Sequence, residues 1–214
     1  MNLLIMGGPG AGKGTMSEKI LEKYGIVHIS TGDIFREEMA SGSKLGQLAK
    51  SYIDEGRLVP DSVTDKMVRY FFERTDCSKG YLLDGYPRTL AQAQAFDEFT
   101  QGTDLEIQKV VVLDIEFEAL KERITGRRIC KNCKAIYHVH SHPSKTEGIC
   151  DVCGGELYQR KDDTVESLTV RLEEYVKMTQ PVLEYYQAKG ILVHVNANQD
   201  IHGVWNDTQK ALED

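Results

Sequence analysis

The chain has 214 residues, of which 41% are hydrophobic and 28% charged, and its net charge is −7 at pH 7. This length suits one domain, with or without inserted subdomains, and it can bury a core without disulfide staples. The acidic balance argues against a protein whose main partner is the backbone of a nucleic acid, because such proteins favour a basic surface. A small anionic ligand is not excluded, since a protein with a negative net charge can still contain a local cluster of arginines.

The N-terminal residues 1–6 form a short apolar run that leads directly into glycine and proline. This run lacks the basic start and the small-residue cleavage site of a signal peptide. No stretch of 18 apolar residues occurs in the sequence, so we expect no membrane-spanning segment and no membrane partner. We therefore expect a cytoplasmic protein.

Short apolar runs alternate with longer stretches of helical period along most of the chain. The predicted strands are residues 3–6, 26–29, 81–83, 110–115 and 191–195. The predicted helices between them include residues 14–24, 63–73, 89–99 and 116–125. Continuously apolar strands are typical of a parallel sheet that is covered by helices on both faces. We predict an α/β fold with a doubly wound, five-stranded parallel core.

Two stretches interrupt this alternation and are predicted to be subdomains that extend from the core. Residues 31–59 contain helical patterns but no strand, and residues 128–159 are rich in cysteine with short β-like pieces. The segment 163–186 that follows is predicted to be one long helix. Pro181 should kink or restart this helix, because proline has no backbone N–H to donate within it.

The first predicted strand is followed by a glycine-rich loop, Gly-Gly-Pro-Gly-Ala-Gly-Lys-Gly-Thr, at residues 7–15. A strand, such a loop and a helix form the context of a phosphate-binding loop, in which backbone N–H groups and the helix N-terminus face the phosphates. Lys13 is predicted to reach the β- and γ-phosphates of a nucleoside triphosphate, and Thr15 to help hold Mg²⁺. Gly14 places this hydroxyl one position later than in the simplest pattern. Five glycines around one lysine favour a phosphate site over a turn without a ligand.

A phosphate-loop enzyme also needs a carboxylate at the end of a neighbouring strand to organise Mg²⁺. Asp84 and Asp114 both follow predicted strands. Asp84 is favoured because it opens the sequence Asp-Gly-Tyr-Pro-Arg, in which glycine permits close approach and Pro87 fixes a turn that presents Arg88. Asp114 is interpreted as a turn residue.

Arginine is the other signal of phosphate chemistry. Eight of the ten arginines lie in loops or at the ends of predicted elements, namely Arg36, Arg57, Arg88, Arg123, Arg127, Arg128, Arg160 and Arg171. Arg69 and Arg74 are interpreted as surface residues of a helix. Guanidinium groups pair with phosphate oxygens and stay charged at any working pH, so the eight loop arginines predict phosphoryl transfer.

Four of the five cysteines form two C-x₂-C pairs, Cys130 with Cys133 and Cys150 with Cys153, sixteen residues apart. Two matched pairs at this spacing favour a zinc site over redox chemistry, and four thiolates leave no position for water, so the metal is predicted to be structural. A nucleic-acid-binding zinc ribbon is an alternative, which the net charge disfavours. Three lid histidines are weaker candidate ligands, namely His138, His140 and His142. Cys77 is interpreted as a partly buried thiol.

Taken together, these motifs resemble those of adenylate kinases. The resemblance rests on the phosphate loop and on residues 30–33 with Arg36, 54–61, 83–89 with Gln92, 125–128 and 159–163 with Arg171. It runs from residue 1 to about residue 200, and it includes the four-cysteine lid of some bacterial members. The resemblance implies reversible, Mg²⁺-dependent phosphoryl transfer from ATP to AMP, which gives two ADP and maintains the balance of adenine nucleotides.

The resemblance also implies a role for each site residue. On the ATP side it places Gly10, Ala11, Gly12, Lys13, Gly14, Thr15, Arg127, Ile136, Tyr137 and Gln199. On the AMP side it places Thr31, Arg36, Arg57, Leu58, Val59, Gly85, Tyr86, Pro87, Arg88, Gln92, Arg160 and Arg171. The residues that act on the transferring phosphate are Lys13, Asp84, Arg88, Arg123, Arg160 and Arg171.

The resemblance further implies a division of the chain and a monomeric enzyme. Residues 1–29, 60–126 and 161–214 form the phosphate-loop core, residues 30–59 the AMP-binding subdomain and residues 127–160 the zinc-binding lid. A kinase for UMP, CMP or GMP stays open as an alternative, because the base pocket cannot be read from spacing. The zinc-ribbon module stays a remote alternative that requires the phosphate loop to be idle.

Overall fold

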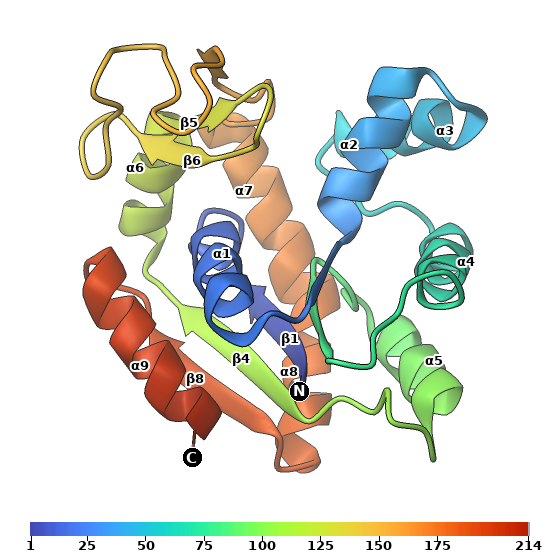
Figure 1. Cartoon of the computed structure of the whole chain (residues 1–214). Coiled ribbons are helices and arrows are strands. Elements are labelled where there is room, and N and C mark those ends of the chain that lie inside the picture. Colours follow the sequence, from blue (N-terminus) through green and yellow to red (C-terminus); the bar gives the residue numbers. More distant parts are fainter. Residues whose placement is uncertain (214) are drawn as a thin grey trace.

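The computed structural model describes residues 1–213 and has a five-stranded parallel sheet at its centre (Figure 1). The strands are β1 (Asn2–Gly7), β2 (Val27–Ser30), β3 (Tyr81–Asp84), β4 (Lys109–Asp114) and β8 (Leu192–Asn196). Their order is β2-β3-β1-β4-β8, and every neighbouring pair is parallel. The α/β fold class and the five strands predicted from the sequence are confirmed, with each strand shifted by no more than a residue or two.

The sheet is buried on both faces, because successive side chains of a strand point in opposite directions. Leu3 and Ile5 of β1 pack in one core cluster, with helices α1 (Lys13–Tyr24), α6 (Phe117–Gly126) and α9 (Ile201–Glu213). Leu4 and Met6 pack in a second cluster, with α4 (Asp61–Phe72), α5 (Leu90–Thr100) and α8 (Gln180–Ala188). Across residues 1–213, none of the helices has both the length and the apolar character needed to cross a membrane.

Residues 31–59 and 128–159, which interrupt the strand–helix alternation, form two lobes outside the core (Figure 1). The helical lobe consists of α2 (Thr31–Ser41) and α3 (Lys44–Ile53), and it has its own apolar cluster around Phe35 and Ala49. The lid consists of three short antiparallel strands, β5 (Arg127–Cys130), β6 (Ile136–His138) and β7 (Leu157–Tyr158). The two lobes stand opposite each other, at upper left and upper right in Figure 1.

The long helix predicted at residues 163–186 is interrupted in the structure. It consists of α7 (Val165–Glu174), a π-helical segment η1 (Tyr175–Thr179) and α8. Thr164 caps its start by accepting a hydrogen bond from the backbone N–H of Ser167. Pro181 lies just after the π-helical segment. Because proline cannot donate to a preceding carbonyl, a wide turn before it lets the helix continue with a change of register rather than end.

Candidate active site

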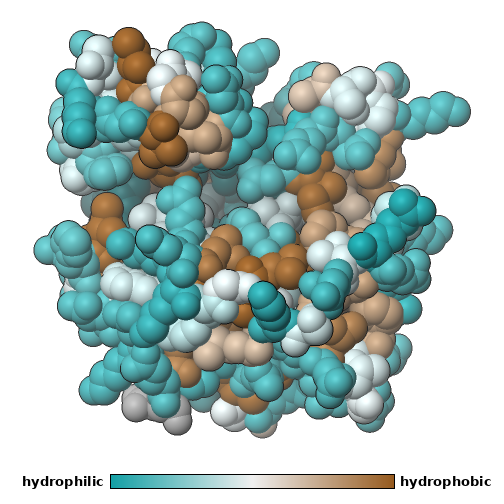
Figure 2. Space-filling view, viewed as in Figure 1, coloured by the Kyte–Doolittle hydropathy of each residue, from teal (hydrophilic) through white to brown (hydrophobic). Residues whose placement is uncertain are grey.

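A cleft opens between the lid and the helical lobe, above the phosphate loop (Figure 2). It brings together segments that lie far apart in the sequence: the phosphate loop, the helical lobe, the loop after β3 and the helix α7. The predicted site residues that line it are Lys13, Thr31, Arg36, Arg57, Leu58, Val59, Gly85, Tyr86, Pro87, Arg88, Gln92 and Arg171. The cleft thus joins the lysine of the predicted ATP side to the residues of the predicted AMP side.

The phosphate loop connects β1 to α1 in a conformation that only glycine adopts easily. Gly10 and Gly12 have φ angles of 87° and 102°, and a Cβ at Gly10 would lie 2.7 Å from the side chain of Ile124. At the start of α1, the ammonium group of Lys13 donates to the carbonyl oxygens of Gly7 at 2.8 Å and Gly8 at 3.0 Å. The loop therefore folds around its lysine and leaves the N-terminus of α1 facing the cleft.

Electrostatics in the cleft act against the positive charge of Lys13. Burial, together with the neighbouring cations Arg88 and Arg171, lowers the pKa of its ammonium group to about 8, whereas the carboxylate of Asp84 opposes the shift. Asp84 ends β3 and lies beside Ile5 of β1. Asp114, the other candidate carboxylate, instead pairs with the exposed His194 at 2.7 Å. Asp84 is thus the strand-end carboxylate that faces the lysine.

Arg88 is held in place by several bonds to its own loop. Its Nε donates to the carbonyl of Gly85 at 2.7 Å, and its backbone N–H donates to Oε1 of Gln92 at 2.7 Å. The peptide bond before Pro87 is cis, and the hydroxyl of Thr179 donates to the carbonyl of Arg88 at 2.9 Å. Burial and the nearby Arg171 lower the pKa of Arg88 to about 10, so the guanidinium stays charged at neutral pH.

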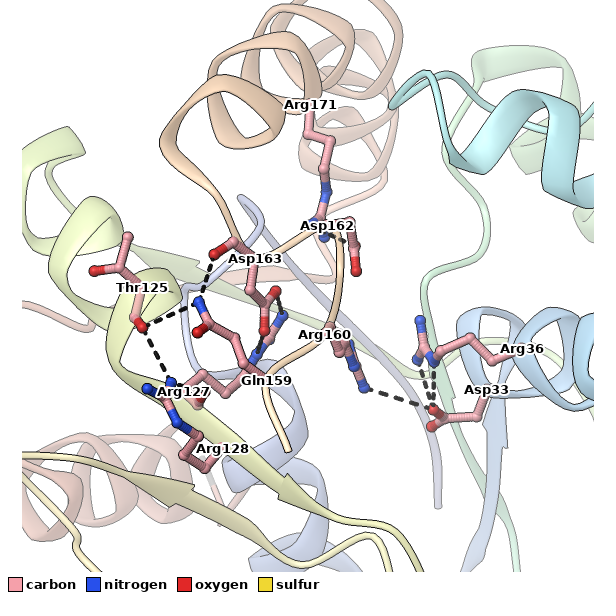
Figure 3. A network of polar contacts seen from close by, with 10 residues as sticks. All are labelled: Asp33, Arg36, Thr125, Arg127, Arg128, Gln159, Arg160, Asp162, Asp163 and Arg171. Carbon is pink, nitrogen blue, oxygen red and sulfur yellow. Dashed lines mark hydrogen bonds and ion pairs between the residues drawn. The ribbon is translucent and has the colours of Figure 1, made fainter. Parts of the chain in front are cut away.

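The remaining arginines of the cleft are paired with carboxylates (Figure 3). Arg36 donates to Asp33 at 2.5 Å, and Arg171 donates to Asp162 at 3.0 Å. Oδ1 of Asp33 also lies 3.9 Å from Nη2 of Arg160, which follows the last strand of the lid. Asp33 and Asp162 belong to motifs of the sequence but were not predicted as site residues. Asp33 lies three positions from its partner Arg36, and Asp162 lies nine positions from Arg171.

Arg127 forms a separate pair at the base of the lid. It donates through two nitrogens to the buried Asp163, with an Nε–Oδ2 distance of 2.9 Å (Figure 3). The same region holds Gln159, which donates to the carbonyl of Asp163 at 2.9 Å. Because Asp163 is almost completely buried, this pair ties the first strand of the lid to the start of α7.

Arg123 and Gln199 lie on the outer side of the phosphate loop. Arg123 donates to the carbonyl of Ala11 at 3.2 Å and to the carbonyl of Ala197 at 2.6 Å. The exposed side chain of Gln199 donates to Asp207 at 2.6 Å. Arg123 therefore connects the phosphate loop to the loop after β8, on which Gln199 lies.

Three further predicted residues have side chains that contact other protein groups. Ile136 of the lid packs on the phosphate-loop helix, where a Cβ at Gly14 would lie 2.8 Å from its Cδ1. Tyr137 is buried inside the lid, with its hydroxyl 3.5 Å from the sulfur of Cys150. Arg57 pairs with Glu55 at the surface, so its guanidinium is turned toward a neighbour on its own loop.

The four lid cysteines converge on one point. All four sulfurs lie within 4.8 Å of one another, with Cys130 and Cys153 3.4 Å apart and Cys133 and Cys150 3.5 Å apart. Sulfurs bound at about 2.3 Å to a tetrahedral zinc ion lie about 3.8 Å apart, so the cluster has the size of a zinc site. Gly155 allows the close approach, because a Cβ there would lie 2.9 Å from the sulfur of Cys130.

The lid histidines are turned away from the cysteine cluster. His138 contacts the carbonyl of Glu122 with Nε2 at 3.2 Å, and its Nδ1 accepts from the backbone N–H groups of His140 and Ser141. The ring of His142 stacks on Tyr137. The geometry therefore favours four cysteine ligands without a histidine.

Comparisons with known proteins agree with this geometry. A model of the family described as adenylate kinase matches residues 5–191. The chain is 52% identical to the adenylate kinase of Geobacillus sp. (strain WCH70) and 51% identical to that of Bacillus subtilis (strain 168), over 99% of the chain and 98% of either relative. It is 48% identical to the adenylate kinase of Thermoanaerobacter sp. (strain X514), over 100% of the chain and 99% of the relative.

The lowered pKa of Lys13 predicts a pH dependence of stability. The folded state holds this proton less tightly than the unfolded state, so the free energy of unfolding rises between pH 8 and the ordinary lysine pKa of 10.5. We expect the wild type to gain about 1–2 kcal/mol relative to Lys13→Met between pH 7.5 and pH 10, a gain limited by the solvent that screens a partly exposed group. Urea unfolding of both proteins at the two pH values measures this difference. If the difference in free energy of unfolding between the two proteins is the same at both pH values, the pKa of Lys13 is not lowered in the folded protein.

Proposed function

This chain belongs to the adenylate kinase family, and from that premise we propose how its cleft carries out the reaction. The reaction is the reversible, Mg²⁺-dependent transfer of a phosphoryl group from ATP to AMP, which gives two ADP. The observation that carries the proposal is the single cleft that joins Lys13 of the phosphate loop to Arg88 and Gln92 of the loop after β3. One nucleotide enters from each side, and their phosphates meet among the arginines.

The phosphate loop binds the phosphates of ATP. Backbone N–H groups of Gly10–Thr15 and the N-terminus of α1 face the anion, and Lys13 exchanges its bonds to Gly7 and Gly8 for phosphate oxygens. Arg127 and the lid strand β6 cover this nucleotide, since Ile136 already lies against Gly14. Tyr137 contributes its backbone rather than its ring, which is buried against the cysteines. Gln199 lies near the adenine.

The opposite wall of the cleft binds AMP. Its base lies among Leu58, Val59 and Gln92, between the helical lobe and the loop after β3. Its phosphate meets Arg36 and Arg88, with Arg160 and Arg171 reaching between the two nucleotides. The further contacts come from Thr31, Arg57, Gly85, Tyr86 and Pro87. Because the carboxylates now paired with Arg36 and Arg171 are replaced by phosphate, binding releases these arginines for transfer.

The chemistry needs positioning and neutralisation of charge, without a covalent intermediate. Lys13, Arg88, Arg123, Arg160 and Arg171 stabilise the charge that spreads over the oxygens of the transferring group. The two lobes close over the cleft and exclude water, which protects ATP from hydrolysis. Asp84 and Thr15 would hold Mg²⁺, since a carboxylate and a hydroxyl supply the oxygen ligands that it prefers, and the bound ion would supply charge neutralisation.

The four cysteines hold a structural zinc ion. Their sulfurs have the spacing of a tetrahedral site, in which zinc binds cysteines as thiolates. None of the four cysteines lines the cleft. The metal therefore stabilises the lid without taking part in the chemistry.

The proposed division of the chain follows from these roles. Residues 127–160 act as the lid, residues 30–59 as the AMP-binding subdomain, and residues 1–29, 60–126 and 161–214 as the core. We propose further that the enzyme acts as a monomer in the cytoplasm without nucleic-acid or membrane partners, which rests on the family resemblance and the acidic net charge.

Arg88→Ala is expected to lower turnover with ATP and AMP by at least about a hundredfold, the scale of losing one preorganised charge contact. A coupled assay of ADP formation measures it, with Arg74→Ala as the control because that arginine packs on Tyr70 at the surface. Assayed with GMP, CMP and UMP as well, the wild type should use AMP best. Near-normal turnover by Arg88→Ala would remove this arginine from the site, and better use of another monophosphate would reassign the acceptor.

Removal of zinc is expected to lower the melting temperature by several degrees, because metal binding contributes to the folding of the lid. The purified protein should contain about one zinc per chain, by metal analysis, before treatment with a chelator and none after it. Cys77→Ser serves as the control and should keep its metal, since Cys77 lies in the main core. A protein that contains no zinc, or whose melting is unchanged by the chelator, contradicts the assignment.

A further inference from the structure

The side-chain amide of Gln92 is fixed at both of its ends. Its Oε1 accepts from the backbone N–H of Arg88 at 2.7 Å, and its Nε2 donates to Oδ1 of Asp61 at 2.8 Å. The glutamine is only 2% exposed but lines the cleft. Asp61 begins α4, directly after residues 57–60, which connect it to the helical lobe. α4 and α5 lie side by side (Figure 1), so the start of one helix holds a side chain of the other.

These two partners permit a single orientation of the amide. A carboxylate can only accept a hydrogen bond and a backbone N–H can only donate one, so Nε2 must face Asp61 and Oε1 must face Arg88. Thr89 strengthens the arrangement, because its hydroxyl donates to Oδ2 of Asp61 at 2.8 Å and accepts from the backbone N–H of Gln92 at 3.1 Å. The amide keeps one N–H and one lone pair free for a ligand.

A side chain that offers a hydrogen-bond donor beside an acceptor can recognise adenine. A glutamine amide pairs with an adenine edge by donating to a ring nitrogen and accepting from the 6-amino group. Hypoxanthine and guanine carry an oxygen at position 6 and an N–H at position 1, so they present the reverse pattern and require the amide to turn over. The orientation of this one amide therefore decides between 6-aminopurines and 6-oxopurines.

We propose that Asp61 is a positioning residue that sets this specificity. The inference rests on the proposed function, in which Gln92 meets the base of the monophosphate. Asp61 lies behind the glutamine and, with Thr89, borders a neighbouring groove rather than the cleft itself. It acts on the acceptor nucleotide only through Gln92.

The neighbouring Asp65 provides a matched control. It lies one turn along the same face of α4 and accepts from the hydroxyl of Tyr86 at 2.9 Å, so it holds the same loop as Asp61 does. Asp65 makes no hydrogen bond to the amide of Gln92. A loss of either carboxylate disturbs the loop, but only the loss of Asp61 removes one of the two hydrogen bonds that fix the orientation of the amide.

The experiment compares kcat/KM for AMP with kcat/KM for IMP, the 6-oxo analogue, in folded variants. Asp61→Ala is expected to lower the AMP-to-IMP ratio about tenfold, because the charged partner of the amide is lost while the bond from Arg88 stays. The larger part of the change should appear in KM for AMP. Asp61→Asn keeps an oxygen for Nε2 and should restore most of the ratio. Asp65→Ala should keep the wild-type ratio even where its rates fall.

An unchanged ratio in Asp61→Ala, or an equal fall in Asp65→Ala, would overturn the proposal. Gln92→Ala separates this failure from a failure of the proposed function: if Gln92→Ala also keeps the ratio, the base does not meet this glutamine at all. If Asp61→Ala does not fold, NMR of the wild-type Gln92 side chain decides. One slowly exchanging Nε2 proton supports the bond to Asp61, and two rapidly exchanging protons contradict it.

Discussion

Positive charge that gathers in a partly buried cleft is the constraint on which the rest of this structure depends. Burial and the repulsion of neighbouring cations lower the pKa values of Lys13, Arg88 and Arg171. Without a ligand, such groups destabilise the folded protein, because several cations lie close together in a cleft that is only partly open to water. The arrangement becomes favourable when phosphate enters, since the phosphates of two nucleotides supply the missing negative charge.

In the proposed function, phosphate replaces two carboxylates that are paired with arginines in the structure. Asp33 pairs with Arg36, and Asp162 pairs with Arg171. Asp163 differs from them, because it is buried and its ion pair with Arg127 joins the lid to the start of α7. We therefore regard the first two pairs as exchangeable and the third as part of the frame that orients the lid.

Much of this architecture could be predicted because the signals are local. The glycine loop with Lys13 follows an apolar strand, the two cysteine pairs carry their own spacing, and the strands are continuously apolar. These patterns led to the fold class, to the zinc site and, through the family resemblance, to the reaction. The family match now favours an enzyme over the alternative of a nucleic-acid-binding zinc ribbon with an idle phosphate loop.

The parts that escaped prediction depend on contacts across space. The π-helical turn before Pro181 reflects how the chain repairs a missing hydrogen bond, which sequence periodicity does not encode. The inward ring of Tyr137 depends on a lid core that forms only around the cysteines. The hydrogen bond from Gln92 to Asp61 joins residues that lie 31 positions apart on two helices, so no local sequence pattern predicts it.

In the proposed function, the phosphate of the nucleotide, rather than its nucleoside, balances the positive charge of the cleft. The most direct test compares the melting temperature of the wild type with saturating AMP and with adenosine, two ligands that differ only in the phosphate. A ligand present at 100 times its Kd adds about 2.7 kcal/mol of stability, which corresponds to several degrees for a chain of this size. The account predicts such a rise with AMP and little change with adenosine at the same concentration. An equal rise with both ligands would contradict it.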